Sequence, residues 1–113
     1  MGFLDRFIRP DPEKRAAFER AAADVDRELA ANIELSAMFD QTHHGVTFEN
    51  AQFVRHIAVL RASAPDAFAL LDAVYAGIPA TESAMERRGP AATLKPADRA
   101  LIEGWEGDVR DAQ

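Results

Sequence analysis

Hydrophobic residues recur along most of this chain at intervals of three and four positions, which is the period of an α-helix buried on one face. The first such stretch runs to about residue 39, contains nothing that breaks a helix, and is rich in Ala, Glu, Arg and Leu. Asp11 is a suitable N-cap and Pro12 suits a first helical turn. We therefore expect a first helix of about 27 residues, or about 40 Å. Its inward stripe is predicted to contain Phe18, Ala22, Val25, Leu29, Ile33 and Ser36, joined near the end by Leu35, Met38 and Phe39.

Glycine and proline residues divide the rest of the chain into shorter helical stretches. Residues 41–45 are predicted to end the first helix, with Gly45 as its left-handed cap, and Thr47 is predicted to be the N-cap of the second helix. Residues 63–66 stop the second helix and start a third, which ends at residues 77–79. The inward residues of these helices are predicted to be Phe53, Ile57 and Leu60, and then Phe68, Leu71, Val74 and Tyr75.

Two more helices are expected, a short one over residues 80–88 and a last one over about residues 96–111. The last helix places Ala97, Leu101, Trp105 and Val109 on one line. No segment of useful length alternates between apolar and polar residues as a β-strand would. The fold class is therefore predicted to be all-α, a compact bundle of four to five helices with a long first helix. We divide the chain into an amphipathic N-terminal segment, residues 1–10, and a single helical domain, residues 11–113.

Composition restricts the function further. The 113 residues carry a formal charge of −6, which argues against a nucleic-acid surface, because such surfaces need clustered Lys and Arg. The chain has no cysteine, so disulfides, thiolate metal sites and thiol nucleophiles are excluded. The apolar part of the N-terminus is interrupted by charges and does not resemble a secretory signal. We expect a cytoplasmic protein.

The N-terminal segment has the clearest functional character. At helical spacing its large apolar residues fall on one side and its charged residues on the other, which predicts a surface that must be covered. It can pack on its own bundle or a second copy, enter a groove on a partner protein, or lie on a membrane. The membrane alternative is not favoured, because the segment is short and carries a net charge of only one. The interacting residues are predicted to be Phe3, Leu4, Phe7 and Ile8.

A metal site is the main chemical alternative. Asp40 and His43 have the i, i+3 spacing of a carboxylate and an imidazole in bundle metal sites, although a di-iron site would need that unit twice. His44 and His56 complete the predicted ligand set of nitrogen and oxygen donors. No other cofactor is expected.

No catalytic constellation is recognisable. The serines lack the context of a nucleophile elbow, and no glycine-rich phosphate loop is present. Trp105 is either an exposed anchor for a partner or, as we favour, the residue that packs the last helix on the core. Asn32 lies in a heptad-like seam where a buried amide can fix the register of a helix pair, but Glu28 interrupts that seam.

The sequence therefore predicts a small non-enzymatic helical module for interaction or regulation, which associates with itself or binds a partner protein. The first alternative is a helical bundle that binds a metal or small ligand through the region of Asp40, His43, His44 and His56. The second is a peripheral membrane adaptor that uses its N-terminal segment.

Overall fold

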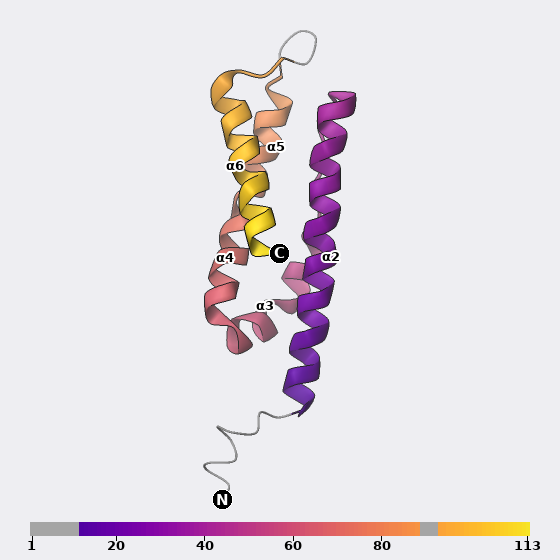
Figure 1. The fold of residues 1–113 in the computed structure, drawn as a ribbon, viewed down its shortest axis with the longest axis vertical. Coiled ribbons are helices and arrows are strands. Elements are labelled where there is room, and N and C mark those ends of the chain that lie inside the picture. The colour runs from indigo at the N-terminus through magenta and orange to yellow at the C-terminus, as the bar shows by residue number, and fades with distance from the viewer. Residues whose placement is uncertain (1–11, 89–92) are drawn as a thin grey trace, which may run out of the picture.

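Helix α2 (Pro12–Thr42) is the longest element of the computed structural model, which describes residues 12–88 and 93–113 (Figure 1). It continues beyond the predicted end at residue 39 and stops at His43, whose φ of 62° is left-handed. The His43 amide donates to the carbonyl of Phe39 at 2.8 Å, which satisfies one of the last helical acceptors. The prediction of Gly45 as the left-handed cap is therefore wrong, since no described glycine has a positive φ.

The other helices are α3 (Ala51–Ser63), α4 (Pro65–Ala76), α5 (Ile78–Glu86) and α6 (Pro96–Ala112). The described residues contain no strand, so the all-α prediction with a long first helix is confirmed. Two predicted starts are wrong. Helix α3 begins at Ala51, four residues after Thr47, and α5 begins at Ile78 rather than residue 80. Pro79 is tolerated in α5 because it occupies the first turn, where its missing N–H has no intrahelical partner.

Helix α6 runs back along α5 and α4, while α2 stands opposite them and packs along α3 (Figure 1). Phe53 of α3 joins the two sides, because its ring stacks on Tyr75 of α4 with centroids 4.2 Å apart and lies 5.8 Å from the ring of Phe68. Burial of such aromatic side chains is a major source of stability in a small core.

Trp105 fixes α6 on α4. Its ring is 5% exposed, its indole nitrogen donates to the carbonyl of Val74 at 2.8 Å, and its centroid lies 4.5 Å from that of Phe48. The structure thus places Trp105 in the core and not on the surface as an anchor. The buried line of α6 contains Ile102, whereas the predicted Leu101 is 36% exposed.

Arg87 and Asp98 hold α5 to α6 across the connection between them. The Arg87 guanidinium donates to the Asp98 carboxylate at 2.7 Å, and this contact lowers the pKa of Asp98. Asp98 also lies in the first turn of α6, where a negative charge is favoured.

The N-terminal segment, with the predicted interaction residues Phe3, Leu4, Phe7 and Ile8, lies outside the described residues. Among the helices that the structure describes, none is both long and apolar enough to cross a membrane.

Candidate functional site

An apolar groove of about 290 Å³ lies between α2 and α4. Val25 and Leu29 of α2 and Leu71 of α4 are buried at its base, and half-buried Phe18 and Phe68 flank it. Asp26 and Gln113 are its polar members. The groove is therefore suited to an apolar group. Its lining is Phe18, Ala22, Val25, Asp26, Leu29, Leu60, Ala64, Ala67, Phe68, Leu71, Ala112 and Gln113.

Alanines leave the groove open. One alanine from α2, one from the corner between α3 and α4, one from α4 and one at the end of α6 line its walls, namely Ala22, Ala64, Ala67 and Ala112. Larger side chains at these positions would fill the space that separates α2 from α4. Because the rest of the lining is largely apolar, burying it against a ligand is favourable.

A hydrogen-bonded carboxylate joins the two walls one turn from the groove. Glu28 is 4% exposed and accepts a hydrogen bond of 2.7 Å from the hydroxyl of Tyr75. Leu71 of the groove precedes Tyr75 by one turn of α4, and Leu29 follows Glu28 directly on α2. Burial and the adjacent Glu28 raise the pKa of Tyr75. This contact sets the separation of α2 and α4 beside the groove.

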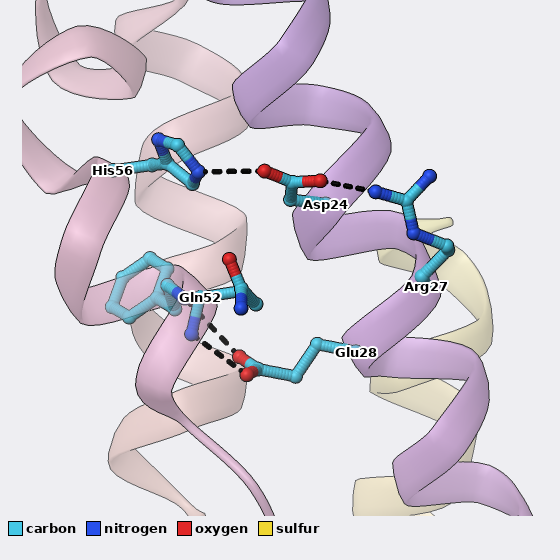
Figure 2. A network of polar contacts seen from close by, with 6 residues as sticks. Asp24, Arg27, Glu28, Gln52 and His56 are labelled. Atoms are coloured by element: carbon cyan, nitrogen blue, oxygen red, sulfur yellow. Dashed lines mark hydrogen bonds and ion pairs between the residues drawn. The ribbon is translucent and has the colours of Figure 1, made fainter.

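The same carboxylate caps α3, as Figure 2 shows. The amides of Gln52 and Phe53 donate to its two oxygens at 2.8 and 3.1 Å. Asn50 occupies the N-cap position but makes no side-chain cap, so the first-turn amides of α3 are satisfied from another helix. Three donors thus converge on Glu28 and compensate for the burial of its carboxylate.

Asp24 continues this polar row one turn earlier on α2 (Figure 2). Its carboxylate lies 3.0 Å from Nε2 of His56 and accepts a hydrogen bond from Arg27. A polar pocket of about 220 Å³ is lined here by Asp24, Arg27, Glu28, Glu49 and Gln52. Because Asp24 and Glu28 already bind protein donors, we interpret this row as structural.

Asn32 and Glu82 hold the segment that leads into α3. The Asn32 amide is fully buried and pairs with the backbone of Glu49, donating at 2.9 Å and accepting at 2.8 Å. The carboxylate of Glu82 accepts from the amide of Phe48 at 2.8 Å. Asn32 therefore fixes a loop, and not the register of two helices.

The predicted metal ligands are only partly brought together. Asp40 and His43 line one polar pocket of about 230 Å³, whereas His44 is exposed and His56 faces Asp24. Within residues 12–88 and 93–113, no three His, Asp or Glu side chains are grouped so that they could hold a metal ion. A metal site that uses all four residues stays a prediction, and this arrangement lends it no support.

Glu106 lies at the same polar pocket. Burial and the neighbouring Asp40 raise the pKa of its carboxyl group, while Arg110, 3.8 Å away, opposes that effect. The pocket is therefore lined by three carboxylates, Asp40, Glu103 and Glu106, and the first two disfavour the charged form of Glu106.

Comparison of the chain with protein-family models, curated proteins and solved structures gives no significant match.

Sequence reasoning found the α2 wall of the groove but not the groove. The predicted inward stripe contains Phe18, Ala22, Val25 and Leu29, and all four line the groove. One sequence signal could have indicated the polar row. Glu28 lies among positions predicted to face the core, and a buried carboxylate requires hydrogen-bond donors from neighbouring elements.

Proposed function

We propose that this protein is a non-enzymatic helical interaction module that binds an amphipathic protein segment in the groove between α2 and α4. The apolar groove is the observation that carries the proposal. A partner helix would place large apolar side chains over Val25, Leu29 and Leu71, in the manner of other helix-in-groove complexes.

The edge of the groove carries exposed Asp26, which favours a basic partner, and the exposed cation Arg61, which lies over the ring of Phe68. The guanidinium of Arg61 lies 5.0 Å from the centre of the Phe68 ring and covers one of its faces. Asp26 is exposed at the groove. The last turn of α6 carries the negative end of the helix dipole and contributes Ala112 to the lining of the groove. A segment with apolar residues on one side and Arg or Lys nearby therefore complements this surface.

The proposal includes a cytoplasmic location and a protein partner or a second copy as the ligand. Membrane attachment is the alternative. The groove favours a protein segment, because its apolar surface is concave and bounded by helices, whereas a membrane adaptor needs an apolar face that projects from the protein.

The test uses a synthetic helix with leucines on one face and lysines on the other. Phe3, Leu4, Phe7 and Ile8 of the protein are first changed to Ser, so that this apolar segment cannot compete. Nuclear magnetic resonance is then used to follow backbone amides during titration. We expect shifts centred on residues 64–68 and on Ala112.

Two matched variants control for nonspecific binding. Ala67 and Ala69 are both exposed on α4, but only Ala67 lines the groove. Ala67→Lys should abolish the shifts, and Ala69→Lys should leave them unchanged. Shifts elsewhere, or equal binding by both variants, would contradict the proposal.

A further inference from the structure

We propose that the resident ligand of this groove is the chain's own N-terminal segment, with Phe3, Leu4, Phe7 and Ile8 folded back in cis onto α2. The segment would then be an autoinhibitory occupant that a partner must displace. This inference rests on the proposed function, because it assumes that the groove accepts an apolar helical segment.

The segment and the groove are chemically complementary. The segment carries four large apolar residues within six positions, and the groove offers buried Val25, Leu29, Leu60 and Leu71 at its base. Its small residues leave room where a second layer of side chains would lie. If the segment binds in the groove, the apolar surfaces of both are removed from water, which is favourable.

The segment is attached close enough to reach the groove. The groove begins on α2 at Phe18, only six residues after Pro12, which is about 9 Å along a helix. Residues 9–11 connect Ile8 to Pro12 and can span about 10 Å when extended. Pro10 and Pro12 disfavour one continuous helix through this connection, so the segment is not held to the axis of α2. A returning segment therefore arrives beside Phe18, Ala22 and Val25.

Charge supports the same occupant. Arg6 and Arg9 make the segment basic, with one aspartate between its apolar residues. The groove contributes exposed Asp26, and the domain beyond the segment is strongly acidic. Opposite charges at the edge would orient the segment without entering the apolar base.

The short tether selects cis binding over exchange between two copies. A segment joined by three residues to the helix that forms its own binding site experiences a local concentration in the range of about millimolar. A second copy competes only when the protein itself approaches that concentration. The bound state is thus expected to be a monomer.

The experiment exploits the absence of cysteine, which allows one spin label to be placed on Gly2→Cys in the full chain. If the segment occupies the groove, the label should eliminate the amide signals of Ala64, Ala67 and Ala112, and reduction of the label should restore them. Gly45, beyond the far end of α2, should keep its signal. Ala67→Lys or Phe7→Asp should restore the groove signals, and Ala69→Lys should not.

A mixed sample distinguishes binding within one chain from exchange of the segment between two copies. Spin-labelled protein without ¹⁵N is combined with unlabelled ¹⁵N protein, so that only contacts between copies broaden signals. We expect no broadening in the mixture. Groove broadening in the mixture, or none in the singly labelled protein, would overturn the cis proposal. In the second case, binding of the synthetic helix by the four-serine variant would show that the proposed function survives, and no binding would remove both.

Discussion

The hydroxyl of Tyr75 and the carboxylate of Glu28 form a 2.7 Å hydrogen bond that joins α4 to α2. The same carboxylate receives the first-turn amides of α3, so a single acid positions three helices. The groove lies between the same two helices, α2 and α4, one turn from this contact.

Glu28→Gln should destabilise the protein. The substitution keeps the size of the side chain but replaces one acceptor oxygen by a donor, so at least one buried donor loses its partner. We expect a loss of about 1–3 kcal/mol in the free energy of unfolding, measured with urea at neutral pH. Glu34→Gln, at an exposed position of the same helix, should change it by less than about 0.5 kcal/mol. Equal stability of both variants would refute the role assigned to Glu28.

Tyr75 should resist ionisation in the folded protein. It is the only tyrosine, so the ultraviolet absorbance of tyrosinate reports on this residue alone. Burial and Glu28 raise its pKa above the ordinary value of 10.0, and we expect no ionisation near pH 10 to 11 while the chain is folded. The unfolded chain binds the proton less tightly, so stability should fall as the pH rises above about 10. A normal titration curve without unfolding would contradict the buried contact.

Glycines within α6 offer a stabilising change. An added Cβ at Gly104 or Gly107 would meet no atom within 4 Å, and alanine favours the helix. Each Gly→Ala substitution should raise the free energy of unfolding by about 0.5–1 kcal/mol. At Gly77 the added Cβ would lie 3.0 Å from Cδ1 of the buried Trp105, so Gly77→Ala should lower stability. Thermal unfolding of the three variants tests the predicted gain in stability at Gly104 and Gly107 and the predicted loss at Gly77.

Glu106→Gln should stabilise the protein at neutral pH and have little effect in acid. Burial and Asp40 raise the pKa of Glu106 in the folded state, so folding favours the protonated form. The stabilising contribution of the protonated group is present below the unfolded pKa and is lost as the pH rises through the folded value. Urea unfolding of both proteins at pH 7.5 and pH 4 measures the difference. A larger gain in the free energy of unfolding at pH 4 than at pH 7.5 would contradict a raised pKa of Glu106 in the folded state.

The fold was accessible to sequence reasoning because periodic apolar residues and Pro or Gly breaks are local signals. The start of α3 was not, because its cap comes from Glu28, which lies 24 residues before Gln52. The left-handed cap was placed at Gly45 on residue type alone, whereas the chain uses His43. Local patterns do not include acceptors that another helix supplies.

The groove was harder to predict from the sequence than the fold was. Phe18, Ala22, Val25 and Leu29 were recognised as one face, but what covers that face depends on how far α4 stands from α2. That separation results from packing and from the Glu28–Tyr75 contact, which no local pattern encodes. The four N-terminal apolar residues were identified from the sequence, and we propose the groove as their binding site.

The measurement that most directly tests groove binding is calorimetric titration of the synthetic helix into the four-serine variant at several temperatures. The comparison adds Ala67→Lys and Ala69→Lys to that variant. We predict binding with a negative heat-capacity change, the mark of apolar burial, in the parent and in Ala69→Lys, and its loss in Ala67→Lys. Equal binding by the two lysine variants, or binding without a heat-capacity change, would contradict an apolar groove as the interaction site.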